Sequence, residues 1–172
     1  PRRAAAPAPR GKPARRELRQ VTTQDETPLL LPSGRALDYR SDMKIADVMR
    51  SRGTTDVVTV SPDQTVTDLL AVLAEHRIGA VIVSADGSTI DGIASERDIV
   101  RRLHDRGAEV LQAPVSEIMT TKVHTCSDDD QIEAVAHLMT QQRVRHLPVV
   151  RETTLYSIVS TGDVVKFRIE QL

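Results

Sequence analysis

The residues best suited to chemistry occur twice, 65 residues apart, as Ser95 with Asp98 and as Ser160 with Asp163. Each pair follows a short apolar run and precedes a second apolar run with a basic end. A Ser followed three residues later by an acid is typical of a helix start, where the Ser caps the helix. A strand that leads directly into such a start presents free backbone N–H groups and a partial positive charge. The pattern therefore predicts two junctions suited to an anion such as phosphate.

The elements around the first junction can be placed from periodicity and capping signals. Ser61 is expected to cap a helix, with Pro62 at its first position and Gln64 closing a capping box. The other expected elements are a short helix over 44–49, strands over 57–60 and 78–83, a hairpin turn at 86–87 into a strand over 90–94, and a last helix from Ser95 to about His104.

The same elements return about 66 residues later, with a helix start at 127–130 and strands over 123–125, 143–150 and 155–160. The apolar faces of the long helices also match, with Val66, Leu69, Leu70 and Leu73 answered by Ile132, Val135, Ala136 and Met139. The chain is therefore interpreted as a tandem repeat of a unit of about 60 residues. Because one unit is small for an independent core, the copies, residues 41–108 and 109–172, are expected to pack together.

Residues 1–40 have a different composition, with prolines among Ala, Arg and Gly. Such a segment cannot bury enough apolar surface to offset its ordering, so a flexible extension is predicted. Its first 20 residues carry seven basic side chains against one acid. An arm for acidic partners and a processed targeting segment remain alternatives for it.

Composition excludes several function classes. The 23 Lys and Arg against 24 Asp and Glu argue against a body that generally binds nucleic acid or membranes, and no apolar run is long enough to span a bilayer. The single cysteine, Cys126, fits a reducing compartment, so a cytoplasmic location is expected. The five histidines lack metal-ligand spacing, and nothing resembles a catalytic constellation. We therefore expect no enzyme, no metal and no required cofactor.

The order of elements, the Ser-x-x-Asp of each copy and the run from His146 to Val150 together resemble a cystathionine-β-synthase-type (CBS) domain pair over residues 43–172. The resemblance implies an α+β fold of two β-α-β-β-α repeats, packed sheet to sheet with pseudo-twofold symmetry. It also implies a stand-alone regulatory module that binds adenine nucleotides, such as AMP, ADP, ATP or NAD(H), in two clefts. A homodimer and an unidentified protein target are expected as partners.

The resemblance also implies roles for individual residues. Asp98 and Asp163 would hold the ribose, because one carboxylate can accept two hydroxyl hydrogen bonds. The candidates for phosphate are Ser95, Arg97, Arg145, His146, Ser160 and Thr161. The candidates around the base and elsewhere in the clefts are Thr55, Val57, Thr121, Lys122, Val123 and Pro148.

Two departures from the family pattern predict that the clefts differ. Ser157 stands where the family usually has Gly, and the first copy has Gly79 and Ala80 where the second has Arg145 and His146. We therefore expect one good site and one weaker or empty site. The simpler alternative is that the motif residues only cap helices and the basic residues only form surface ion pairs.

A second class of function also remains open. In it, the clefts are vestigial and the basic extension binds nucleic acid or an acidic partner in a salt-sensitive way. For the homodimer, the candidate interface is formed by the helix around 46–49 and by Val100, Leu103, Val165 and Phe167.

Overall fold

A computed structural model describes residues 42–53 and 56–172 of the chain. The predicted extension over 1–40 and the candidate Thr55 lie outside the described residues. The roles suggested for them therefore stay predictions.

Two three-stranded sheets with the same topology form the centre of the molecule. β1 (Thr59–Val60), β2 (Ala80–Val83) and β3 (Gly92–Ser95) form the first, and β4 (Cys126–Ser127), β5 (His146–Arg151) and β6 (Thr154–Ser160) form the second. In each sheet the first two strands are parallel and the last two antiparallel. The repeated register confirms the tandem repeat.

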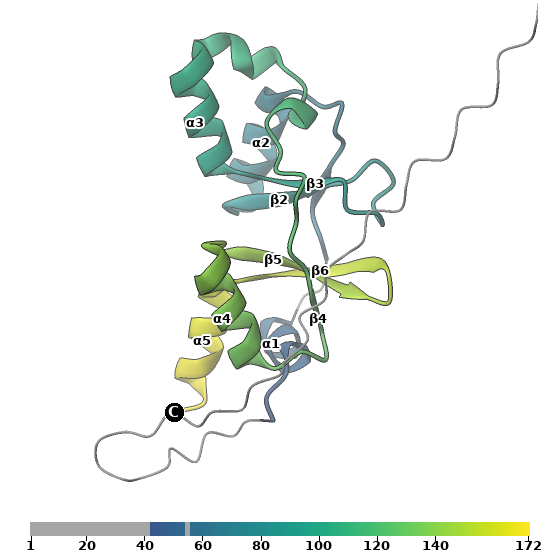
Figure 1. The fold of residues 1–172 in the computed structure, drawn as a ribbon, viewed down its shortest axis with the longest axis vertical. Helices are drawn as coiled ribbons and strands as arrows, with labels where there is room; N and C mark the ends of the chain where they lie inside the picture. The colour runs from purple at the N-terminus through teal and green to yellow at the C-terminus, as the bar shows by residue number, and fades with distance from the viewer. Residues whose placement is uncertain (1–41, 54–55) are drawn as a thin grey trace, which may run out of the picture.

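The helices cover the outer faces, so the two sheets face each other (Figure 1). The first sheet carries α2 (Val66–His76) and α3 (Glu96–Arg106), and the second carries α4 (Ile132–Gln142), α5 (Thr161–Glu170) and α1 (Ile45–Arg52). The predicted α+β fold, with two repeats packed sheet to sheet, is confirmed.

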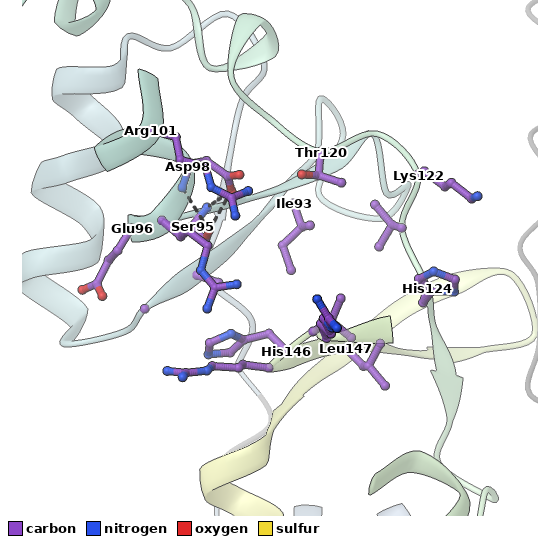
Figure 2. A pocket seen from close by; sticks show the side chains of 17 residues that line it. Ile93, Ser95, Glu96, Asp98, Arg101, Thr120, Lys122, His124, His146 and Leu147 are labelled. Atoms are coloured by element: carbon purple, nitrogen blue, oxygen red, sulfur yellow. Dashed lines mark hydrogen bonds between the residues drawn. The ribbon is translucent and has the colours of Figure 1, made fainter. Parts of the chain in front are cut away.

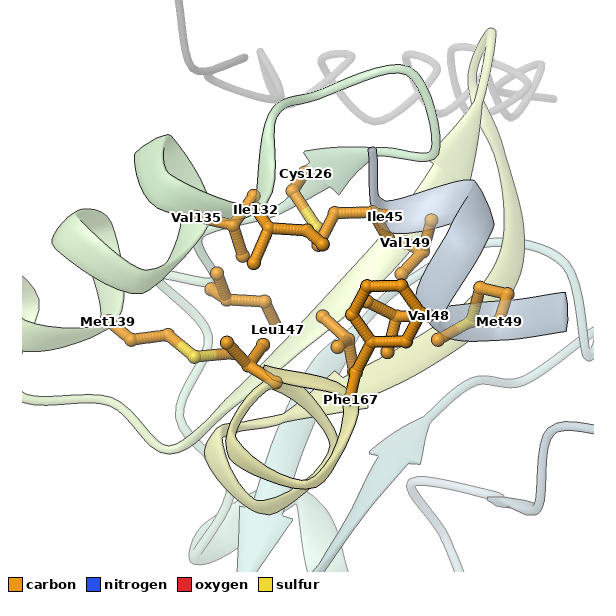
Figure 3. Close-up of a cluster of buried hydrophobic side chains, with 12 residues drawn as sticks. Ile45, Val48, Met49, Cys126, Ile132, Val135, Met139, Leu147, Val149 and Phe167 are labelled. Atoms are coloured by element: carbon orange, nitrogen blue, oxygen red, sulfur yellow. The ribbon is translucent and has the colours of Figure 1, made fainter. Parts of the chain in front are cut away.

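The first helix of each repeat packs into the core of the other repeat. From α1, Ile45, Val48 and Met49 join the buried cluster of the second half, where Phe167 lies beside Val48 (Figure 3). The connection between the halves contains the 3-10 helices η1 (Gly107–Gln112) and η2 (Val115–Glu117), and its buried side chains join the cluster of the first half. Each sequence repeat therefore needs the other to complete its core.

Matched backbone hydrogen bonds fix this exchange. Ile45 N–H donates to the Asp130 carbonyl at 2.9 Å, and Val115 N–H donates to the Gln64 carbonyl at 2.8 Å. The short-helix residues of these pairs are 70 apart, whereas their acceptors are 66 apart. The first copy therefore carries four more residues after its short helix starts, and α1 extends to Arg52 with Gly53 as its left-handed C-cap.

The two long helices begin later than the sequence signals indicate. α2 starts at Val66, capped by Thr65 in a box with Asp68, rather than at Ser61. The residues from Ser61 form a turn instead, because the carbonyls of Pro62 and Gln64 accept hydrogen bonds from the η2 backbone. The predicted start at 127–130 is wrong for the same reason, since those carbonyls bind the start of α1 and α4 begins at Ile132.

Part of the expected dimer interface is buried in the core. Phe167 is 6 % exposed and Met49 is 3 % exposed, so neither is available to a partner. Val100 and Val165, at equivalent positions of α3 and α5, remain exposed. No helix among the described residues is long and apolar enough to cross a membrane.

Candidate functional site

A cavity of about 410 Å³ lies between the two halves (Figure 2). Its walls come from three segments that are distant in sequence: the start of β2 with the β3–α3 junction, the connection before β4, and the start of β5. The lining residues are Gly79, Ala80, Ile93, Ser95, Glu96, Arg97, Asp98, Arg101, Thr120, Lys122, Val123, His124, Arg143, Val144, Arg145, His146 and Leu147. Its size is in the range typical of small-molecule sites.

The first Ser–Asp pair forms one wall of this cavity. Ser95 N–H and Ser95 Oγ both donate to Asp98 Oδ2, at 2.8 and 2.7 Å. Asp98 N–H completes the capping box by donating to Ser95 Oγ at 3.4 Å. Among the described residues no hydrogen bond reaches Asp98 Oδ1. The cap therefore fixes the half-buried carboxylate while one oxygen stays available.

The connection between the halves closes the side of the cavity beside β3. Ile93 and Thr120 exchange two backbone hydrogen bonds, of 3.0 and 2.8 Å, which attach this segment as an extra strand. Gly92 permits the approach, because a Cβ there would lie 2.7 Å from Met119 Sδ and 2.9 Å from the Thr120 carbonyl. This placement brings Lys122 and Val123 to the cavity.

Positive charge dominates the lining. Five permanently charged cations face two carboxylates, which gives an excess of three positive charges: Arg97, Arg101, Lys122, Arg143 and Arg145 against Glu96 and Asp98. The apolar part of the lining includes Ile93 and Leu147, which lie on opposite sides of the space (Figure 2). The cavity thus offers an apolar slot, one oriented carboxylate and several cations.

His146 lies at the start of β5, against Gly79 of the other half, where a glycine Cβ would be 3.6 Å from His146 Cε1. Burial lowers the pKa of its imidazole, and Arg145 lowers it further, while Asp163 and Glu96 oppose the shift. The neutral ring is therefore favoured in the folded protein.

The second Ser–Asp pair has a different environment. Ser160 and Asp163 form the same capping box, with Ser160 N–H and Oγ both 2.8 Å from Asp163 Oδ2. Neither residue lines the 410 Å³ cavity. The guanidinium of Arg52 is 3.4 Å from Asp163 Oδ2 instead.

The structure gathers half of the sequence-predicted site residues around one cavity, namely Ser95, Arg97, Asp98, Lys122, Val123, Arg145 and His146. Those that do not line it are Val57, Thr121, Pro148, Ser160, Thr161 and Asp163. Pro148 is buried in β5, and Thr161 Oγ1 donates to the Arg145 carbonyl at 3.4 Å.

Sequence reasoning did not assign Arg101, Thr120, His124 and Arg143 to the site. Arg101 had a usable signal, because it follows Asp98 by three residues and so lies on the same helix face. Thr120 and His124 had none, since only the strand-like docking of the connection brings them to the cavity.

No group of three or more His, Cys, Asp or Glu side chains suited to a metal ion occurs in the part of the chain that the structure describes. Burial raises the pKa of the Cys126 thiol to about 12, and the nearby Asp130 and Asp128 raise it further. Cys126 is therefore held as a thiol and is a poor nucleophile.

Two repeats around a shared basic cavity define the class of protein, a two-repeat binding module. The chain belongs to the CBS domain family, because the model of the CBS domain matches residues 45–105 and 115–170.

Among curated proteins, the chain is 36 % identical over 110 residues to the CBS domain-containing protein YhcV of Bacillus subtilis, covering 64 % of this chain and 77 % of that one. The crystal structure of a CBS-domain containing protein from Agrobacterium tumefaciens matches with a TM-score of 0.70 and 40 % identity, over 73 % of this chain and 99 % of that one. The CBS domain pair of protein MJ0100, solved with 5-methylthioadenosine and S-adenosyl-L-methionine, shares the fold at 20 % identity, with a TM-score of 0.66 over 76 % of this chain and 98 % of that one.

Proposed function

We propose that the cavity binds an adenine nucleotide and that the chain is a regulatory module that signals its occupancy to a partner protein. The observation that carries the proposal is the carboxylate of Asp98, fixed through one oxygen and open through the other, beside a cluster of cations. Membership of the CBS family supports it, as does the adenosyl ligand pair in the related MJ0100 fold.

The lining supplies a partner for each part of a nucleotide. Asp98 would accept the vicinal hydroxyls of the ribose, since a carboxylate has lone pairs for both. Ile93 and Leu147 would enclose the base between apolar surfaces. Arg97 and Arg145 would hold phosphate oxygens, for which the planar guanidinium is well suited.

The charge of the lining favours ligands with more phosphate groups. With three excess positive charges around the cavity, each added phosphate gains Coulomb energy, so we expect affinity to increase from AMP to ADP to ATP. NAD and NADH should rank near ADP, and the cationic S-adenosylmethionine should bind most weakly. Salt screens exposed charges, so the difference between ATP and AMP should shrink as salt is raised.

Calorimetric titration of the full chain with AMP, ADP, ATP, NAD, NADH and S-adenosylmethionine tests the proposal. Asp98→Ala should weaken ATP binding by about tenfold to a hundredfold, the cost of a lost hydrogen bond to a charged group. Asp163→Ala is the matched control, because it breaks the same kind of capping box outside the cavity. No binding across the panel by folded protein, or equal losses from both variants, would reject the proposal.

The regulatory part of the proposal concerns what occupancy changes. A ligand shifts a conformational equilibrium only as far as its affinities for the two states differ. Because the cavity is built from both halves and from the connection between them, ligand contacts on all three segments would favour one arrangement of the halves. The target protein would recognise that arrangement.

A further inference from the structure

The last residue of α1, Arg52, reaches from the exchanged helix into the junction of the second repeat. Its guanidinium donates to the Ile158 carbonyl at 2.8 Å and to Ser157 Oγ at 3.0 Å. It also lies 3.4 Å from Asp163 Oδ2. The side chains of Arg52 and Asp163 are only 25 % and 24 % exposed, so this ion pair is largely withdrawn from water.

The equivalent positions of the first repeat are arranged differently. The Ile93 carbonyl, which corresponds to that of Ile158, accepts from the backbone N–H of Thr120. Gly92, which corresponds to Ser157, offers no side chain. Within the described residues Asp98 makes no ion pair. The second junction therefore holds a cation of the chain at the place where the first presents an open carboxylate.

Two departures in the sequence produce this contact. The four additional residues in the first copy extend α1 by about one turn and carry Arg52 to the junction, whereas η2 in the second copy is a short 3-10 helix. Ser157 then supplies an acceptor that a glycine would lack. A longer helix without Ser157, or Ser157 without the longer helix, would not make all three contacts.

We propose that Arg52 is an internal cation that keeps the second cleft closed to nucleotide, so that one chain binds one ligand. This inference rests on the proposed function of the 410 Å³ cavity. A ribose would have to displace the guanidinium from Asp163, and the displaced cation would leave two other hydrogen-bond acceptors, both largely shielded from water, without their partner. Arg52 thereby determines the stoichiometry.

Titration of the full chain with ATP, on variants chosen around Arg52, tests this role. The unmodified chain should bind one ATP, and Arg52→Ala should bind a second ATP at a new site. Adding Asp163→Ala to Arg52→Ala should return the number to one. Arg50→Ala is the matched control, because Arg50 lies on the same helix but pairs with Asp47 at the surface, and it should leave the number at one.

Two ATP molecules on the unmodified chain would overturn the inference. So would a single ATP on both Arg52→Ala and the gentler Arg52→Gln, with both variants shown to be folded. If no variant binds any nucleotide, the proposed function fails, and the ligand-free chain then decides on Arg52. In urea unfolding, coupled effects of Arg52→Ala and Asp163→Ala would retain the closing contact, and additive effects would overturn it.

Discussion

Asp98 and Asp163 occupy equivalent positions in the two repeats and close identical capping boxes, yet their carboxylates have different neighbours. Asp98 faces the cavity, and Asp163 faces Arg52. Capping is a local property that both retain, whereas ligand binding depends on what the rest of the fold brings alongside. A residue type at the right spacing thus identifies a candidate, and its neighbours determine which candidate is open.

Gly92 provides a test of close packing at this scale. Gly92→Ala should destabilise the fold by about 1–3 kcal/mol, because its Cβ would collide with Met119 and with the backbone of Thr120. Gly162→Ala is the control, since the nearest atom there is Ser160 Oγ at 3.5 Å and the site is helical. The control should be neutral or stabilising by about 0.5–1 kcal/mol. Urea unfolding measures both, and equal effects would contradict the packing argument.

His146 should make stability depend on pH. Its folded pKa lies below the ordinary value of about 6.5, chiefly because the ring is partly buried. The unfolded chain therefore binds more protons as pH falls through about 6.5, so His146 contributes stability above that value that is lost below it. His146→Gln should lose less stability than the unmodified chain between about pH 7.5 and about pH 5.5. Parallel stability profiles in urea unfolding would exclude this contribution.

At the scale of elements, the exchange of short helices is the feature with the largest consequences. α1 contributes three side chains to the core of the second half and also delivers Arg52 to the second junction. The stability of the second half and the state of its cleft therefore depend on a helix that precedes the first repeat in sequence.

Ile45→Ala measures how much this exchange stabilises the protein. Ile45 is fully buried, so its truncation should cost about 2–5 kcal/mol through lost apolar burial and a residual cavity. Ile169→Ala on α5 is the matched control, since Ile169 is 63 % exposed and should lose little. Chemical unfolding monitored by circular dichroism gives both values. A small loss for Ile45→Ala would mean that the second core does not need α1.

At the scale of the whole molecule, exposed apolar side chains lie on corresponding sites of the two repeats. Val100 on α3 is 65 % exposed and Val165 on α5 is 51 % exposed, and each follows its motif Ser by five residues. The pseudo-symmetry places one on each half. A second copy of the chain would cover such a paired surface, so the expected homodimer stays a prediction with this narrower interface.

Charged substitutions test the predicted homodimer. The double variant Val100→Asp, Val165→Asp should shift the chain from dimer to monomer in sedimentation velocity, because burying two new carboxylates is costly. Leu70→Asp, on an exposed apolar residue of α2, should leave the dimer intact. A monomeric unmodified chain, or an unchanged dimer in the double variant, would reject this interface.

Much of the fold followed from the sequence because its signals are local. Helical and strand periodicity, the Ser-x-x-Asp caps and the internal repeat predicted the order of elements and the α+β class, and the structure confirms them. The same local signals misplaced the starts of α2 and α4. At Ser61 and at 127–130, tertiary hydrogen bonds from the exchanged helices use the backbone carbonyls of the expected first turns.

The sequence by itself determined the two candidate junctions and their capping chemistry, and its departures at Ser157 and Gly79 indicated that the clefts would differ. Only the tertiary structure decided how they differ. The cavity forms from segments that are distant in sequence, and Arg52 reaches Asp163 across 111 residues of chain. No local pattern encodes such a contact, because it depends on which core each short helix joins.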